Sequence, residues 1–143
     1  MKLRTNGIVF QVAELRDNAY DHVSKELRRL GLDDLAPSHG LILITLYRER
    51  ALSLKDLSVR INKKKSSTTE LVDKLIRLGY VEKTASSEDQ RVKLVRLTEK
   101  SLSHKQDFKA LSDSVNGRLY QGFTAEDKRE LMRLMNKALA NYS

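Results

Sequence analysis

Residues 53–100 hold two short helical patterns followed by two strand patterns that a polar segment joins. In the second helical pattern, apolar residues recur at steps of three and four, which gathers them on one helical face: Leu71, Val72, Leu75 and Leu78. A shorter pattern of the same kind precedes it and comprises Leu54, Leu57 and Ile61. It ends at Asn62, a residue that tolerates a turn conformation. The stretch therefore predicts two helices that meet at a corner.

The strand patterns begin once Gly79 has ended the second helix. Tyr80, Val81 and Thr84 suit a strand, and a second strand pattern follows the polar segment 85–90: Val92, Leu94, Val95 and Leu97. We expect the two to pair as a hairpin whose tip is a wing. The adjacent Leu94 and Val95 break strict alternation, which edge packing against a helix explains. Helices and wing together predict a winged helix-turn-helix, a DNA-binding module.

The polar face of the second helix is the one predicted to face the major groove, and it carries Ser66, Thr69, Glu70, Asp73 and Arg77. Three lysines, Lys63, Lys64 and Lys65, cluster at its leading end. The whole chain has 27 Lys and Arg against 19 Asp and Glu, a net charge of +8 that favours polyanionic partners. The net charge supports DNA binding because the three lysines lie where a helix would enter the groove.

Several functional classes are excluded by what the composition lacks. The 143 residues suit one domain, and the absence of cysteine excludes disulfides, thiolate zinc sites and a cysteine redox switch. His22, His39 and His104 lack the short spacing of a metal site, and no phosphate loop or activated nucleophile is present, so we expect no metal, no cofactor and no catalysis. No apolar stretch is long enough for a membrane span, and the polar N-terminus, MKLRTNG, lacks a signal-peptide core. We therefore expect a cytoplasmic protein.

Long helices are predicted on both sides of this module. Apolar steps of three and four predict one from residue 8 to residue 30, and Pro37 suits the start of a buried helix that continues to Glu49. Thr98 is predicted to cap a long helix that ends near Gly122 and Phe123. Thr124, with Asp127 three positions on, is predicted to cap the last helix.

The predicted fold is mainly α with a small β-hairpin wing, in one domain spanning residues 1–143. The winged helix-turn-helix lobe is residues 37–98, and helices 8–30 and 99–142 form a dimerisation region. The small lobe cannot cover the apolar stripes of these helices, so a two-fold homodimer is expected. The alternative is a monomeric bundle in which the terminal helices cover one another.

Nearly the whole chain resembles the MarR family of bacterial transcription regulators. ELVDKLIRLGYVEK is similar to the family's recognition helix and first wing strand, and SSEDQRVKLVRLTEK to its wing signature. The resemblance implies that Arg91 enters the minor groove, where negative potential is concentrated, and that Asp89 holds Arg91 or the loop in place. The alternative is a plain surface ion pair, worth at most about 1 kcal/mol.

For the recognition helix, the resemblance implies phosphate or base contacts by Lys65, Ser66, Ser67 and Thr69. Glu70 and Lys64 depart from the family, which commonly has a basic residue and a serine cap at these positions. A Ser67–Glu70 capping box would start the helix two residues later than the family alignment, so both starts remain open. Pairs of Glu70 with Lys74 and of Asp73 with Arg77 are expected to occupy the two carboxylates.

Two further departures from the family lie outside the recognition helix. Ala36 replaces the threonine that often caps the buried helix, and Ser101 replaces the glycine that ends the wing signature. A missing cap costs about 1 kcal/mol, so neither departure should change the fold.

The resemblance implies a homodimer that binds a pseudo-palindromic operator in double-stranded DNA and regulates transcription, as a repressor or as an activator. It also implies a small-molecule effector between the dimer helices and the DNA-binding lobe, although no residue identifies that ligand. The rival interpretation is a winged-helix domain for protein–protein contacts, in which the basicity is incidental.

Overall fold

A computed structural model describes residues 7–143 of the chain. Most of the polar N-terminus, up to Asn6, lies outside the described residues. The elements, in chain order, are α1 (Ile8–Arg29), α2 (Pro37–Glu49), β1 (Ala51–Ser53), α3 (Leu54–Ile61), α4 (Lys65–Arg77), β2 (Val81–Ala85), β3 (Lys93–Leu97), α5 (Glu99–Ser103), α6 (Lys105–Leu119) and α7 (Ala125–Ala140).

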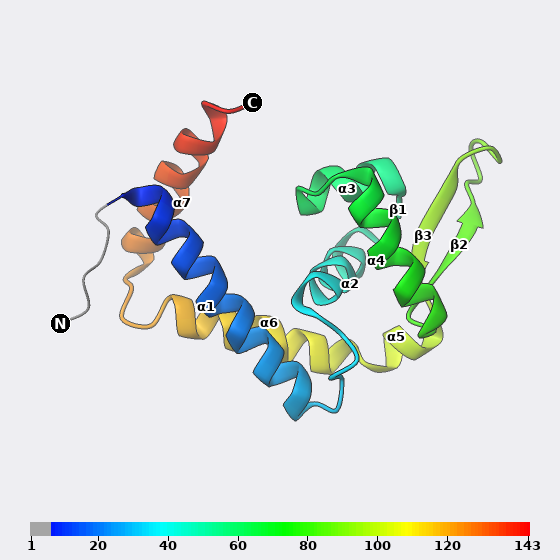
Figure 1. Ribbon diagram of the computed structural model, residues 1–143, viewed down its shortest axis with the longest axis horizontal. Helices are drawn as coiled ribbons and strands as arrows, with labels where there is room; N and C mark the ends of the chain where they lie inside the picture. The colour runs from blue at the N-terminus through cyan, green and yellow to red at the C-terminus, as the bar shows by residue number, and fades with distance from the viewer. Residues whose placement is uncertain (1–6) are drawn as a thin grey trace.

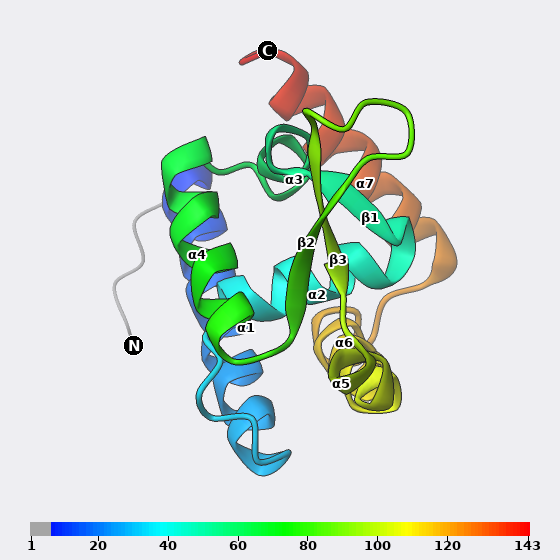
Figure 2. The ribbon, with the colours of Figure 1, turned by 90° about the vertical axis from the view of Figure 1, so that its right-hand side faces the viewer.

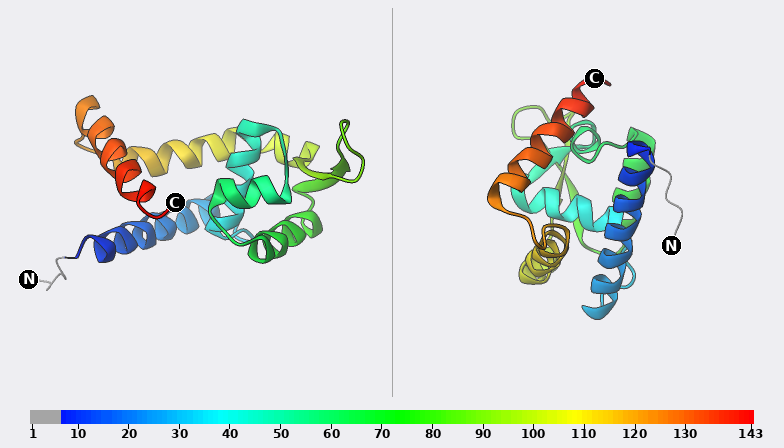
Figure 3. Two further views of the ribbon diagram at one scale, coloured as in Figure 1. Left: turned by 90° about the horizontal axis from the view of Figure 1, so that it is seen from above. Right: turned by 90° about the vertical axis from the view of Figure 1, so that its left-hand side faces the viewer.

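The chain forms a lobe and a helical limb (Figure 1). The lobe contains α2, α3, α4 and the sheet, whereas α1 and α6 run side by side away from it and α7 lies at the far end (Figures 1 and 3). This is the predicted arrangement of a mainly α winged helix-turn-helix lobe with long terminal helices. The helical interpretation of the apolar run after Pro37 is also confirmed.

The sheet has three strands in the order β1-β3-β2, all antiparallel. The predicted hairpin is confirmed, with Val81 opposite Leu97 and Ala85 opposite Lys93. The sheet also contains β1, which pairs Ala51 with Arg96 and was not predicted. Three residues are too few to show a strand period, so only the partner strand defines β1.

The core surrounds α2, whose Ile42, Leu43 and Leu46 are fully buried. Leu57 from α3 and Val72 and Leu75 from α4 pack into the same cluster. The limb joins this core through Phe108 and Leu111 of α6, and the Phe108 ring lies 5.7 Å from that of Tyr47. The fixed position of the lobe on the limb follows from this shared apolar contact.

His39 supplies the cap that Ala36 lacks. The backbone N–H of Ala36 donates to Nδ1 of His39 over 2.9 Å, and His39 is only 5% exposed. Burial lowers the pKa of His39 from its ordinary value of 6.5, with Lys74 adding to the effect. The imidazole therefore stays neutral near pH 7 and keeps Nδ1 as an acceptor.

The single helix predicted from Thr98 onward is wrong, because the chain breaks at His104 into α5 and α6. Thr98 caps α5 as predicted, but His104 has φ −93° and ψ 8°, outside regular helix geometry. The second helix then ends at Leu119, before Gly122. Apolar spacing continues across the break, so periodicity alone did not reveal it.

Contacts from α5 explain why the chain turns there. Thr98 donates from Oγ1 to the carbonyl of Gly79 over 2.5 Å, and Lys100 donates from Nζ to that of Leu78 over 2.7 Å. The buried Ser101 donates from Oγ to the carbonyl of Tyr80. The end of α4 is thereby joined to the start of the limb. Ser101 stands where the family pattern has glycine, and its hydroxyl forms one of the hydrogen bonds that join α4 to the limb.

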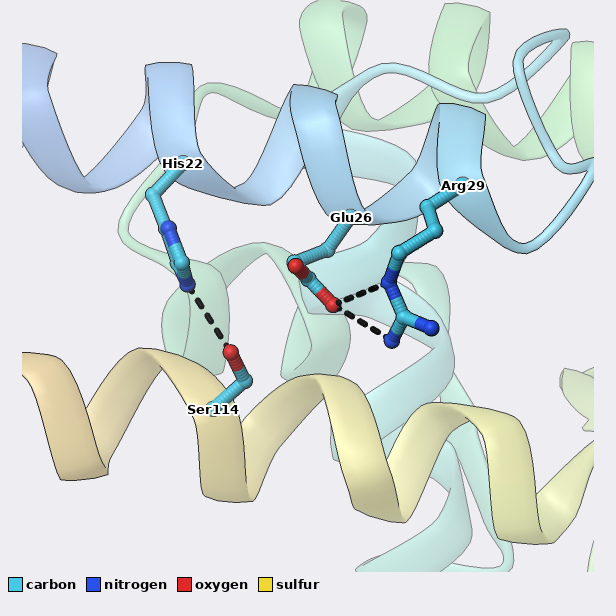
Figure 4. Close-up of polar contacts among 4 residues, drawn as sticks. All are labelled: His22, Glu26, Arg29 and Ser114. Carbon is cyan, nitrogen blue, oxygen red and sulfur yellow. Dashed lines mark hydrogen bonds and ion pairs between the residues drawn. The ribbon is translucent and has the colours of Figure 1, made fainter.

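The two long limb helices are also joined by a polar contact. His22 Nε2 of α1 lies 2.9 Å from Ser114 Oγ of α6 (Figure 4). One turn further along α1, the carboxylate of Glu26 accepts two hydrogen bonds from Arg29, which lower its pKa (Figure 4). The carboxylate is therefore paired within its own helix.

Candidate nucleic-acid interface

The recognition helix α4 begins at Lys65, the earlier of the two starts left open by the sequence. Lys64 is its N-cap residue, and the side chain of Lys64 makes no capping hydrogen bond. The alternative capping box of Ser67 with Glu70 is wrong, because Ser67 lies within the first turn of the helix. The first backbone N–H groups of α4 are therefore left without a side-chain acceptor.

The predicted contact residues gather at this helix start. Lys64, Lys65, Ser66 and Ser67 are exposed, and Lys63 is half-buried in the preceding turn. That turn is made by Asn62, whose φ of 53° confirms the predicted turn conformation. Three cations and two hydroxyls are thus presented beside free N–H groups, an arrangement suited to phosphate.

Thr69 is less available than predicted because it is half-buried and its Oγ1 donates to the carbonyl of Lys65 over 2.8 Å. Its neighbour Thr68 is fully buried and donates in the same way to the carbonyl of Lys64 over 2.9 Å. Both hydroxyls support the first turn of α4. Only the acceptor lone pairs of Thr69 remain for a ligand.

The predicted pairs of Glu70 with Lys74 and of Asp73 with Arg77 are wrong. Neither pair is among the contacts within 4.0 Å that residues 7–143 form. Spacing brings such side chains near one another, but exposed pairs gain little and keep their rotamer freedom. Glu70 is therefore an exposed carboxylate beside the lysine cluster.

The wing tip holds Arg91 through Asp89. Oδ1 of Asp89 accepts from the backbone N–H of Arg91 over 3.0 Å and from its Nε over 3.3 Å. The carbonyl of Asp89 also accepts from Val92 N–H, which closes the loop. The Arg91 side chain is nevertheless 92% exposed, so the terminal guanidinium nitrogens remain free for another acceptor.

The two sites lie on one edge of the lobe. The turn between α3 and α4 and the tip of the wing are both at the top of Figures 1 and 2, with α3 between them. No carboxylate from another element pairs with Lys63, Lys64 or Lys65 within residues 7–143. This edge consequently presents positive charge from two separate elements.

Val59 on α3 is a surface residue that sequence reasoning missed. It is 72% exposed and lies with Asn62, Lys63 and Lys64 around a shallow hollow. The sequence did contain a sign of this exposure, because Val59 lies outside the apolar stripe that Leu54, Leu57 and Ile61 form. An apolar side chain here suits contact with a sugar or a thymine methyl group.

The limb leaves much apolar surface uncovered. No residue of α7 is buried, and Leu139 is 61% exposed. The first turns of α1 add Ile8, Val9 and Phe10, all largely exposed. Thr124 and Asp127 cap α7 reciprocally as predicted, each over 3.0 Å, so this helix is well formed although it is uncovered.

The lobe matches a known protein family. The MarR family model matches residues 35–93, which span the lobe from before α2 to the start of β3. Over these residues the chain is similar to the MarR family.

The curated relatives of this chain are named transcriptional regulators. The HTH-type transcriptional regulator PrsX of Escherichia coli is 29% identical over 121 residues, covering 83% of this chain and 70% of the relative. SarZ of Staphylococcus haemolyticus is 26% identical over 110 residues, covering 76% and 72%.

Solved structures share the fold of this chain. A mutant of Escherichia coli MarR complexed with operator DNA has a TM-score of 0.79 at 19% identity, covering 92% of this chain and 93% of the other. A MarR regulator from Methanosarcina mazei has a TM-score of 0.78 at 24% identity, covering 94% of each chain.

No group of three or more His, Asp or Glu side chains within residues 7–143 is placed to hold a metal ion. None of the helices in the same range is both long and apolar enough to cross a membrane.

Proposed function

We propose that this chain is a sequence-specific regulator that binds an operator in double-stranded DNA. The observation that carries the proposal is the shared edge formed by the start of α4 and the wing tip. The N–H groups of α4 and its three lysines suit a phosphate of the backbone, and Ser66 and Ser67 project beside them toward the major groove. Arg91, oriented by Asp89, is proposed to enter the adjacent minor groove.

The experiment is a selection of bound sites from random duplexes, followed by titrations of the recovered site. Arg91→Ala should bind it more weakly with unchanged helicity, because Arg91 makes no packing contact with the lobe that the substitution removes. Lys109→Ala is the matched control, since it also removes one cation but on α6, where Lys109 pairs with Asp113. Equal affinity of Arg91→Ala and the native chain would refute the wing contact.

A second result bears on the rival protein–protein role. If no duplex from the selection binds better than random DNA even at low salt, the regulator proposal fails. Sequence-dependent binding that weakens steeply with salt supports it.

We further propose that two copies form a homodimer through the limb. The support is the uncovered apolar surface of α1 and α7, which a monomeric bundle would have buried. Two lobes held in this way can place their α4 helices in successive major grooves, roughly 34–36 Å apart. A protein that regulates the genes beside such an operator works in the cellular compartment that contains the DNA.

Sedimentation at micromolar concentration tests the dimer. Leu139→Glu should shift the chain toward the monomer, because a charge buried in an apolar interface is costly. Lys137→Glu, also on α7, controls for the change of charge on that helix. A native chain that sediments as a monomer would overturn the dimer.

A small-molecule effector is the remaining part of the proposal. A cavity of about 190 Å³ lies between α1, α2 and α6, at the boundary of lobe and limb. Its lining is largely apolar and includes Tyr20, Leu41 and Val115. A molecule bound there would contact both the limb and α2, and so could change the spacing of the two α4 helices. Protection of Tyr20 from chemical modification by a ligand that also releases operator DNA would support this site.

A further inference from the structure

Glu70 lies at the middle of the outward face of α4. It is exposed, whereas Val72, two residues further on, is fully buried. Successive residues of a helix are turned by about 100°, so two steps place Glu70 on the side opposite Val72. The helix itself runs along the outside of the lobe (Figures 2 and 3). In a complex with α4 in the major groove, Glu70 therefore faces the base pairs.

Glu70 is also close enough to the start of α4 to reach base edges. The helix begins at Lys65, and Glu70 lies one turn beyond Ser66. In helix-turn-helix complexes, the N-terminal residues of the recognition helix are the ones that contact bases. Ser66 and Ser67 carry short hydroxyls that both donate and accept, so they discriminate little between bases. Glu70 has the longer side chain and only accepts.

The rest of α4 lacks the side chains that commonly read purines. It contains no Asn or Gln, and its one arginine, Arg77, is the last residue of the helix. Arginine pairs with guanine, and asparagine or glutamine pairs with adenine. The strongest base-reading group near the start of α4 is therefore a carboxylate, which detects a donor on a base edge.

The Glu70 carboxylate is not neutralised within the lobe. Among residues 7–143, no Lys, Arg or His nitrogen lies within 4.0 Å of it. DNA phosphates repel a carboxylate, so Glu70 weakens binding to any duplex that offers it no donor. Such a residue lowers affinity in general and raises specificity for the sequence that does offer one.

Cytosine is the base whose major-groove edge best suits a carboxylate. Its N4 amino group is a donor, whereas guanine presents the acceptors N7 and O6, and thymine the acceptor O4. Adenine has a donor at N6, but its adjacent N7 acceptor repels the second carboxylate oxygen. A carboxylate therefore favours cytosine over the other three bases.

We propose that Glu70 selects a cytosine in each half of the operator by accepting a hydrogen bond from its N4 amino group, a role that rests on the regulator function proposed above. Exchange of this cytosine for guanine or thymine should weaken binding about tenfold, because an acceptor then faces the carboxylate. A basic residue at this position would favour guanine instead. Glu70 is thus a specificity-determining residue of this chain.

The test repeats the selection from random duplexes with the native chain and with variants. Glu70→Ala should recover the native operator except at one position in each half, where the cytosine preference is lost. Glu70→Gln should prefer adenine at that position, since an amide pairs with N6 and N7 of adenine. Recovery of the full native sequence by both variants would overturn the proposal, as would a changed position that is not cytosine in the native selection.

Glu82→Gln is the matched control. Glu82 is also exposed and forms no ion pair within residues 7–143, but it lies on β2. Its selected sequence should be the native one. Glu70→Ala should also bind random duplexes more tightly than the native chain, because a repulsive charge is removed. Tighter binding of every sequence, with cytosine still preferred, would show that the carboxylate acts through charge alone and would overturn the proposal.

A modified operator identifies the donor atom. N4-methylcytosine still pairs with guanine, but a methyl group replaces the amino hydrogen that faces the major groove. This base should weaken binding of the native chain about tenfold and leave binding of Glu70→Ala unchanged. Equal losses for both proteins would show that the methyl group meets another side chain and would overturn the assignment.

Failure of this proposal differs from failure of the regulator function. A native chain that recovers no preferred sequence refutes the regulator function, and cytosine selection with it. A native chain that recovers an operator, which both Glu70 variants then recover unchanged, refutes only the role of Glu70. The variants should keep native helicity in circular dichroism, because the Glu70 side chain is exposed.

Discussion

Replacing Lys64 by serine should make this protein more stable and a weaker DNA binder. Lys64 is the N-cap of α4, with φ −64° and ψ 150°, a backbone conformation that suits a capping serine. A serine there can accept from the N–H of Ser67, which has no side-chain cap at present. The cap is worth about 1 kcal/mol, and removing a cation from the positive end of the helix adds roughly 0.5 kcal/mol.

The sum of about 1.5 kcal/mol corresponds to a rise in Tm of roughly 3–6 °C for a chain of this size. Urea and thermal unfolding at one fixed protein concentration measure it, because the Tm of a dimer depends on concentration. Lys64→Ala is the control, since it removes the same charge without adding a cap and should recover only the smaller part. Equal stability of the serine and alanine variants would refute the capping argument.

DNA binding should move in the opposite direction. A serine at residue 64 removes one cation per subunit and occupies an N–H group that we propose for a phosphate. A serine variant that is more stable and binds operator as tightly as the native chain would show that neither group contacts DNA.

Three further outcomes follow from particular contacts. Lys65→Ala should reduce the slope of log K against log salt by about 1.8 for a dimer, or 0.9 for each lost phosphate contact, and an unchanged slope in filter-binding titrations would remove Lys65 from the interface. Because burial lowers the pKa of His39 below 6.5, the unfolded chain binds that proton more tightly; the free energy of unfolding should therefore fall as pH drops below 6.5, towards the lowered folded-state pKa. His39→Gln keeps an acceptor for Ala36 N–H and should lose this part of the pH dependence in urea titrations at pH 7.5 and 5.5. Ser101→Ala should lower the free energy of unfolding by about 1 kcal/mol, since the carbonyl of Tyr80 loses one donor but keeps Thr98 N–H; no change in urea unfolding would contradict the role given to this contact.

The candidate interface was predicted closely where the signal was local. Lys63, Lys64 and Lys65 adjoin the start of a strongly periodic helix, and Asn62 marks the turn before it, so position along the chain was enough to place them together. The exact start of α4 was not predictable from capping rules alone. Ser67 and Glu70 satisfy those rules, but burial of Thr68 against the core fixes the helix two residues earlier.

Other predictions failed where a distant segment decides the outcome. The strand β1 exists because β3 pairs with it, and the break at His104 follows from the hydrogen bonds that hold α5 to Gly79 and Tyr80. Neither partner is near in sequence. The two expected carboxylate pairs on α4 failed for another reason, because spacing permits an exposed ion pair but supplies little energy to hold it.

The sequence by itself determined the helices, the hairpin and the basic start of α4, because apolar periodicity and turn residues act over a few neighbouring positions. Tertiary structure alone decided which surfaces remain open. It left α7 uncovered, turned Arg91 outward on Asp89, and gathered α1, α2 and α6 around one cavity. Such convergence depends on how elements pack, and local spacing carries no record of it.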